Sequence, residues 1–315
     1  KYTLMTEHVC PVGALTSQDF RFKARVWFLK SAPSVCPGCA TGCNSHADYD
    51  PRNGKIYRLR PRDNAEVNKF WMCDDGMMTY TRHDKDRLLM PTLGRGDGRM
   101  PVGENEALIL GAEKLQGVDG AKLAVILSAQ HSTEDNLAMA KLASALGVER
   151  LYLAALPNWE GDDILRSEDQ NPNRAGATLA AGERPLRPLS ELLTDVQSGA
   201  VEAVIALGWA AEQGLDALAP LLGLDQVVSL TSHVGALPAV ASVAIPVGDI
   251  TEIHGSFINA KGMSQSFRPV LPAPAGIEPA WKTIAELARR LGKDLGFDSI
   301  ERLREGLVDA AEAAQ

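Results

Sequence analysis

Four of the five cysteines in this 315-residue chain lie within the short segment 36–73. They are Cys36, Cys39, Cys43 and Cys73. The spacing C-x2-C-x3-C-x29-C puts three thiols on one loop that contains proline and glycine, and the fourth returns later in the chain. Four thiolates are the usual ligands of a [4Fe–4S] cluster. The spacing therefore predicts an iron–sulfur site, and electron transfer as its purpose.

Structural zinc is the alternative for these four cysteines, because zinc also binds four thiolates. Zinc sites usually take their ligands from two C-x2-C-like pairs, whereas three of these cysteines share one loop. A disulfide framework fits poorly, since the cysteines are odd in number and clustered. The segment 1–14 has no continuous apolar core of a secretory signal, so a reducing compartment is expected, where clustered thiols usually hold metal.

The fifth cysteine, Cys10, precedes Pro11 in the sequence CPVGALTS. A Cys-Pro step is typical of the last ligand in a ferredoxin-like cluster motif. The other ligands of such a cluster would have to come from upstream sequence. A free cysteine with no ligand role is the alternative for Cys10.

The pattern of secondary structure changes along the chain, and the predicted fold class is α/β. Before residue 86, the segments 45–49 and 55–60 are predicted strands around an Asn-Gly hairpin turn. Beyond residue 100, apolar strands alternate with helices, which indicates an open parallel sheet covered on both faces. The predicted strands are 123–127, 150–154, 203–207, 227–230 and 239–246. The predicted helices are 104–115, 132–146, 189–197, one from about 210, 281–291 and 299–314. The Gly/Pro-rich segment 157–188 is predicted to be a functional or interface loop.

Composition and charge exclude some classes of protein. The net charge of −8 disfavours nucleic acid as a partner, because phosphate binding requires a basic surface. The sequence has no stretch approaching the roughly 18 apolar residues that a membrane-spanning helix needs. The arginines at 58 and 60 would share one face of a strand, where they could offset cluster charge or form a solvated surface.

Several motifs resemble one known family. The stretches 10–17 and 20–25 resemble a junction in the large iron–sulfur subunits of NADH-quinone oxidoreductase, respiratory complex I. The segment 36–76 resembles the iron–sulfur module of the molybdopterin oxidoreductase superfamily, to which those subunits are related. Three later stretches are similar to the same family: Asp162–Arg166, Asn171–Ala177 and Gly255–Gly262.

This resemblance implies a fold, a function and partners. Residues 1–30 would end a ferredoxin-like cluster region and form a connector, 31–85 would be the [4Fe–4S] module, and 86–315 an α/β domain of the molybdopterin oxidoreductase type. Cys10 would be the distal ligand of a second [4Fe–4S] cluster, on the main electron path from NADH and flavin toward quinone. The four-cysteine cluster would lie off that path. The chain would have no independent active site and would bind other complex I subunits, at the cytoplasmic side of the inner membrane and only peripherally through those partners.

Two departures from the molybdenum enzymes indicate that molybdopterin is not bound. Those enzymes often carry a Lys two residues after the last cysteine, where this chain has Asp75. They are also far longer, with further domains that close around the cofactor. The alternative is a truncated α subunit of a molybdopterin-dependent oxidoreductase, such as an NAD-linked formate dehydrogenase, and stoichiometric molybdenum would support it.

We predict that the purified protein is brown and that dithionite reduction produces the EPR signal of one [4Fe–4S] cluster in this chain. The physical reason is that four thiolates at this spacing match the ligand set of a cubane. Iron and zinc analysis on the same sample is the control. A colourless preparation with stoichiometric zinc would contradict the prediction.

Overall fold

The computed structural model describes residues 1–313 and divides the chain into two compact units. Unit 1 comprises three segments, Lys1–Lys85, Asn158–Pro172 and Asp249–Ala273. Unit 2 comprises Asp86–Pro157, Asn173–Gly248 and the chain from Pro274 onward. The strand–helix periodicity does not indicate that the segments 158–172 and 249–273 join the first unit, because this grouping depends on tertiary contacts.

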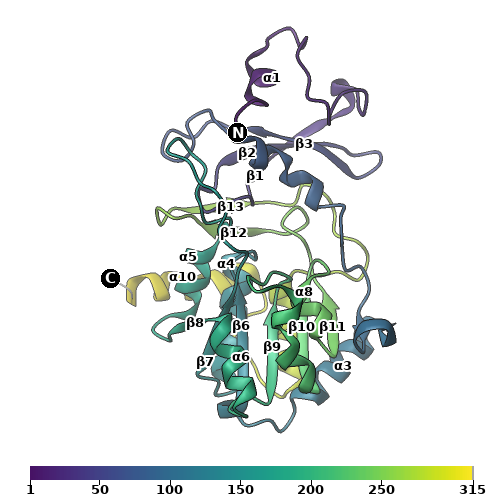
Figure 1. The fold of residues 1–315 in the computed structure, drawn as a ribbon, viewed down its shortest axis with the longest axis vertical. Helices are drawn as coiled ribbons and strands as arrows, with labels where there is room; N and C mark the ends of the chain where they lie inside the picture. Colours follow the sequence, from purple (N-terminus) through teal and green to yellow (C-terminus); the bar gives the residue numbers. More distant parts are fainter. Residues whose placement is uncertain (314–315) are drawn as a thin grey trace. The chain divides into compact units, whose positions relative to one another are not determined.

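Unit 1 is built on a three-stranded antiparallel sheet in the order β1-β2-β3 and a separate two-stranded ribbon of β12 and β13 (Figure 1). Its strands are β1 (Lys30–Val35), β2 (Asn44–Asp50), β3 (Lys55–Pro61), β12 (Gly255–Ile258) and β13 (Ser264–Phe267). Its helices are α1 (Met5–Val9), α2 (Asp74–Met78) and the 3-10 turns η1 (Val26–Phe28) and η2 (Thr79–Arg82).

The predicted hairpin of unit 1 is confirmed. Strands β2 and β3 pair in antiparallel register across the turn that contains Asn53 and Gly54. Gly54 has φ +64°, a left-handed conformation that glycine adopts without strain. The Asp50 carboxylate accepts a hydrogen bond from the backbone N–H of Arg52 at 2.9 Å, which stabilises the start of the turn.

Unit 2 contains an eight-stranded sheet in the order β5-β4-β11-β10-β9-β6-β7-β8. The strands from β11 to β8 pair in parallel, and β4 and β5 extend one edge in antiparallel fashion. The strands are β4 (Thr92–Leu93), β5 (Met100–Pro101), β6 (Leu123–Ser128), β7 (Arg150–Ala154), β8 (Leu186–Pro188), β9 (Ala203–Leu207), β10 (Gln226–Thr231) and β11 (Val243–Pro246). The α-helices are α3 (Glu104–Leu115), α4 (Thr133–Ala145), α5 (Arg174–Ala181), α6 (Leu189–Gln197), α7 (Gly214–Ala217), α8 (Ala236–Val240), α9 (Ala280–Arg290) and α10 (Ile300–Ala313). The 3-10 turns are η3 (Gly96–Gly98), η4 (Gly120–Lys122) and η5 (Ala219–Gly223).

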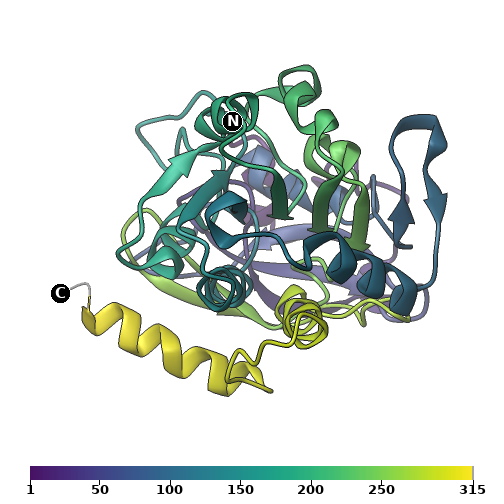
Figure 2. The ribbon, with the colours of Figure 1, turned by 90° about the horizontal axis from the view of Figure 1, so that it is seen from below.

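Helices cover both faces of this sheet, as the alternation of strands and helices predicts. Along β6, Val125 packs into one apolar core with α3, α4 and α9, whereas its neighbour Ile126 packs into the opposite core with α6 and α8. This alternation follows from the two-residue period of a strand, and both side chains are fully buried. Figure 2 shows α9 and α10, in yellow, on one side of the sheet.

The predicted start of the helix after β6 is also confirmed. The Ser132 hydroxyl accepts a hydrogen bond from the backbone N–H of Asp135 at 3.0 Å, and the helix α4 follows directly. Such a cap satisfies one of the backbone N–H groups that a helix leaves unpaired at its first turn. This placement fixes the N-terminus of α4 beside the carboxyl end of β6.

Three sequence-based boundaries differ from the structure. The apolar pattern predicts one strand over 239–246, but Pro238 and its neighbours form α8, and β11 begins only at Val243. The helix expected from about Ala210 begins at Gly214. The long loop 157–188 contains α5 and β8, which its Gly/Pro content obscures. The predicted end of the last helix, Ala314, lies outside the described residues.

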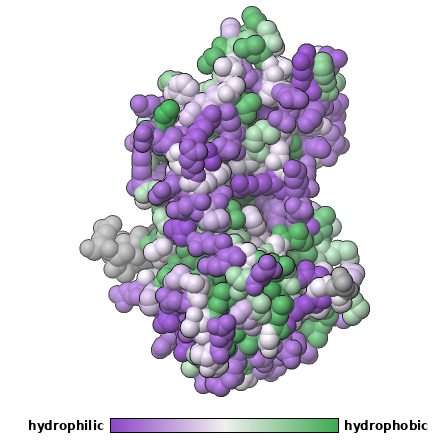
Figure 3. All heavy atoms as spheres, in the orientation of Figure 1, coloured by the Kyte–Doolittle hydropathy of each residue, from purple (hydrophilic) through white to green (hydrophobic). Residues whose placement is uncertain are grey.

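The face in view in Figure 3 is mostly hydrophilic, with groups of hydrophobic residues among the hydrophilic ones. Within residues 1–313, no helix has the length and apolar character required to cross a bilayer. Exposed apolar side chains gather in the segment after α1, where Val12, Phe22 and Trp27 are each at least 73% exposed.

We predict that Leu142→Ala destabilises the protein by about 2–5 kcal/mol, because it opens a cavity in the core beneath α4. Urea unfolding followed by circular dichroism measures the change. Leu215→Ala is the matched control, since Leu215 is 51% exposed and its truncation should alter stability by less than about 0.5 kcal/mol. Equal effects of the two substitutions would contradict this description of the core.

Candidate iron–sulfur site

The four clustered cysteines come together in unit 1, as their spacing predicts. Cys36 follows β1, Cys39 lies in the loop, Cys43 precedes β2, and Cys73 precedes α2; each is at most 4% exposed. The loop closes on itself because the backbone N–H of Cys36 donates to the carbonyl of Cys43 at 2.8 Å. Gly42 provides the turn, with φ +64°, and a Cβ there would lie 2.8 Å from Gln265 Nε2, the end of a side chain that would have to move.

Burial and mutual repulsion make Cys36, Cys43 and Cys73 poor acids in the absence of a positive partner. Burial is the main reason that the pKa values of Cys36 and Cys43 are raised, and the neighbouring cysteines raise them further. Burial likewise raises the pKa of Cys73 to about 11. Iron ions supply the positive charge that stabilises such thiolates, so this donor set fits an iron–sulfur cluster.

Backbone N–H groups point at two of the sulfur atoms. The N–H of Gly38 donates to Cys36 Sγ at 3.4 Å, and the N–H of Gly76 donates to Cys73 Sγ at 3.3 Å. Both donors are glycines in tight surroundings: a Cβ on Gly76 would lie 3.1 Å from Cys36 Sγ. Hydrogen bonds to sulfur are among the features that set the reduction potential of a cluster.

The arrangement does not resemble a site for one ion. Among the residues that the structure describes, no group of three or more His, Cys, Asp or Glu side chains is placed to hold a single metal ion. A cubane does not require such a group, because each of its four thiolates binds a different iron. The absence of a single-ion site among the described residues is therefore compatible with a four-iron cluster bound by these thiols.

Apolar side chains surround the thiols and limit the access of water. Cys36 and Cys43 belong to a buried cluster with Met72, Met77 and Ile56. Met72 is fully buried, whereas its neighbour Trp71 remains 38% exposed. Met72 and the buried apolar cluster therefore shield the thiols from water more than Trp71 does.

The segment 158–172 of unit 1 binds the cysteine loop, a contact that no spacing in the sequence indicates. The Thr41 hydroxyl donates to the carbonyl of Leu165 at 2.6 Å, and the N–H of Ala40 donates to the carbonyl of Asp169 at 2.8 Å. In addition, Arg166 Nη1 lies 3.1 Å from Asp75 Oδ2. The resemblance of 162–166 to the family is the sequence signal that marks this segment.

The arginines of β3 pair with a carboxylate of the sheet. Arg58 Nε and Arg60 Nε lie 2.8 and 2.7 Å from Asp48 Oδ2, whose side chain is 5% exposed. Burial raises the pKa of Asp48, but the hydrogen bonds from Arg60 and Arg58 outweigh it and hold this pKa below its usual range. The alternative of a purely solvated arginine face is therefore wrong, because both guanidinium groups form ion pairs with Asp48.

Cys10 lies apart from the four buried thiols, on a loop of its own. The backbone N–H groups of Leu15 and Ala14 are the main cause of a lowered pKa of the Cys10 thiol, which is partly exposed. A thiolate stabilised in this way is the form that binds metal. The geometry is compatible with a cluster ligand.

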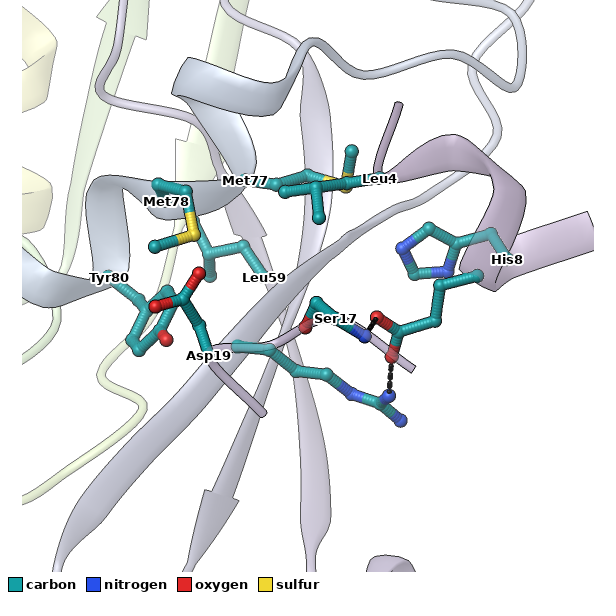
Figure 4. A pocket seen from close by; sticks show the side chains of 10 residues that line it. Leu4, His8, Ser17, Asp19, Leu59, Met77, Met78 and Tyr80 are labelled. Atoms are coloured by element: carbon teal, nitrogen blue, oxygen red, sulfur yellow. Dashed lines mark hydrogen bonds and ion pairs between the residues drawn. The ribbon is translucent and has the colours of Figure 1, made fainter. Parts of the chain in front are cut away.

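The Glu7 side chain attaches the Cys10 loop to the sheet, beside a small pocket (Figure 4). The Glu7 carboxylate accepts hydrogen bonds from the backbone N–H of Ser17 at 2.8 Å and from Arg58 Nη1 at 2.6 Å. His8, Met77 and other side chains line about 20 Å³ of space, room for about one water molecule. The Glu7 carboxylate thus links the loop at Ser17 to β3 at Arg58.

We predict that Gly76→Ala lowers the iron content of the purified protein, because the added methyl group crowds Cys36 Sγ and Cys73 Sγ. Iron per chain and absorbance in the charge-transfer region measure the effect. Gly103→Ala is the control, since a Cβ there meets no atom within 4 Å. Unchanged iron content in Gly76→Ala would contradict the proposed packing of the thiols.

Comparison with known proteins places these observations in a family context. Residues 29–85 match the family model of the molybdopterin oxidoreductase Fe4S4 domain. NADH-quinone oxidoreductase subunit 3 of Thermus thermophilus is 35% identical over 144 residues, 45% of this chain and 18% of that protein. A subunit of NADH-quinone oxidoreductase from Streptomyces coelicolor is 28% identical over 98% of this chain and 33% of its own length. The chain thus spans about a fifth to a third of these relatives.

A solved structure supports the fold class. Acetylene hydratase from Pelobacter acetylenicus has a TM-score of 0.63 to this chain at 12% identity, over 89% of this chain and 72% of the other. At this identity the likeness concerns the fold alone. The predicted α/β fold, a small β-rich module with an open parallel sheet, is confirmed, and the alternative of a formate dehydrogenase α subunit gains no better support. Residues 29–85 match the Fe4S4 domain, and the chain is similar to subunits of NADH-quinone oxidoreductase, as its motifs indicate.

Proposed function

We propose that this chain is an iron–sulfur electron-transfer subunit of an NADH:quinone oxidoreductase, relaying electrons from NADH and flavin toward quinone. The observation that carries the proposal is the set of four buried thiols inside a segment matching the Fe4S4 domain. Similarity over 98% of the chain to the Streptomyces coelicolor protein supports the choice of complex. As part of an oxidoreductase complex, it would have no independent active site.

The proposed ligands of the [4Fe–4S] cluster are the four clustered cysteines. They are Cys36, Cys39, Cys43 and Cys73. Such a cluster, when bound, accepts and releases one electron at a time. The N–H groups of Gly38 and Gly76 orient the sulfur atoms, and Met72 excludes water. These features let the protein fix the position and the potential of the site without acid–base chemistry.

Cys10 is the proposed distal ligand of a second [4Fe–4S] cluster, completed by residues upstream of this sequence. Its thiol lies among backbone N–H groups that favour the thiolate, and the Glu7–Arg58 pair attaches its loop to the cluster module. In this proposal residues 1–30 end a ferredoxin-like region, 31–85 form the [4Fe–4S] module, and 86–315 are an α/β domain without molybdopterin.

The proposed partners are other subunits of the same complex, including the flavin-bearing subunit and the quinone-side iron–sulfur subunits. The exposed apolar side chains after α1, among them Val12 and Trp27, provide surface for such contacts. The proposed location is the cytoplasmic side of the inner membrane, with membrane attachment through the partners alone.

We predict that Cys10→Ser, made in the complex that contains this chain, removes most NADH-to-quinone electron transfer, because a centre on the main path is lost. Cys39→Ser should remove one EPR signal and leave much of this activity, since its cluster lies off that path. NADH oxidation with a quinone acceptor in membranes measures both.

The control is an exposed serine, Ser190→Ala, which should leave both the signals and the rate unchanged. Immunoblotting of the complex tests whether each variant assembles. Full activity in an assembled Cys10→Ser complex would contradict the relay role.

A further inference from the structure

We propose that Arg166 and Asp75 form a charge pair that sets the reduction potential of the four-cysteine cluster, with Arg166 as a positioning residue outside the ligand set. The inference rests on the proposed function, because it assumes a cluster at these thiols. It assigns a role to the segment 158–172, which the ligand set leaves unexplained.

The two charges meet beside the last cysteine. Asp75 stands two residues after Cys73, on the first turn of α2, and its Oδ2 lies 3.1 Å from Arg166 Nη1. The Arg166 side chain is 10% exposed and that of Asp75 is 44% exposed. Solvent therefore screens the carboxylate more strongly than the guanidinium.

The chain holds Arg166 firmly in this position. The Asp162 carboxylate accepts hydrogen bonds from the backbone N–H groups of Ile164, Leu165 and Arg166, which fixes the turn. Burial would raise the pKa of Asp162, but these bonds and that from Tyr2 lower it to about 2. On the other side, the Trp159 ring centre lies 4.0 Å from Arg166 Cζ, a cation–π contact.

The pair with Asp75 leaves part of the hydrogen-bonding capacity of the Arg166 guanidinium unused. Arg166 Nε is buried and has no hydrogen-bond partner among the described residues. Its positive charge is paired with Asp75 and lies over the ring of Trp159. A charge this buried acts strongly on its surroundings, because little water screens it.

The two members of the pair act in opposite directions at the sulfur. The carboxylate of Asp75, on the helix that Cys73 caps, and the guanidinium of Arg166, 3.1 Å from it, present fields of opposite sign to the cluster. The same fields act on an electron added to iron beside that sulfur, since net charge near a cluster shifts its potential. A negative neighbour lowers the reduction potential, and a positive neighbour raises it.

Potentiometric titration of the 315-residue chain, with its cluster reconstituted and followed by EPR, tests this inference. Asp75→Asn is expected to raise the midpoint potential and Asp75→Lys to raise it further. Arg166→Gln is expected to lower it, and Arg166→Lys to restore most of the wild-type value. The double variant Asp75→Asn, Arg166→Gln should return close to wild type, because both charges are removed.

The matched control is Asp84→Asn, which removes a carboxylate that is also half exposed, at 48%, and pairs with Lys55. Shifts of the same sign in Asp75→Asn and Arg166→Gln, or potentials equal to wild type, would overturn the inference. If Arg166→Gln does not fold, the ordered series at Asp75 decides the question alone. A wild-type chain that binds no four-iron cluster would instead refute the proposed function, and iron analysis separates the two failures.

Discussion

The burial of four thiols side by side is the constraint on which unit 1 depends. Without a positive partner, burial and mutual repulsion keep the thiols of Cys36 and Cys43 protonated. A metal cluster removes this conflict, because iron charge stabilises the thiolates and the bonds cross-link distant parts of the chain. The small core around Ile56 and Met72 would then be completed by the cluster it surrounds.

This constraint explains why the module includes segments from elsewhere in the sequence. The segment 158–172 forms hydrogen bonds with the cysteine loop at Ala40 and Thr41. The segment 249–273 supplies Gln265, which packs against Gly42. Loops that reach back in this way fix the ligand geometry without needing a large hydrophobic core.

Unit 2 is stabilised differently, by ordinary apolar packing. Residues of β6 alternate between two cores, so each face of the sheet has its own layer of helices. The strand order reverses between β6 and β9, the place where many open α/β sheets bind ligands. In the proposed function this unit keeps the scaffold of the molybdopterin oxidoreductases without their cofactor.

The sequence by itself determined the features that depend on local spacing. The cysteine pattern, the Asn53-Gly54 turn and the strand–helix alternation all follow from neighbouring residues, and the structure contains the thiol group, the hairpin and the covered sheet they predict. Only the tertiary structure decided that Arg166 pairs with Asp75 and that both arginines of β3 form ion pairs with Asp48. These contacts join residues that are far apart in the chain or lie on different strands, and the periodicity of a sequence does not predict contacts of this kind. The Gly/Pro signal of 157–188 hid α5, although the alanine-rich sequence of Arg174–Ala181 itself favours a helix.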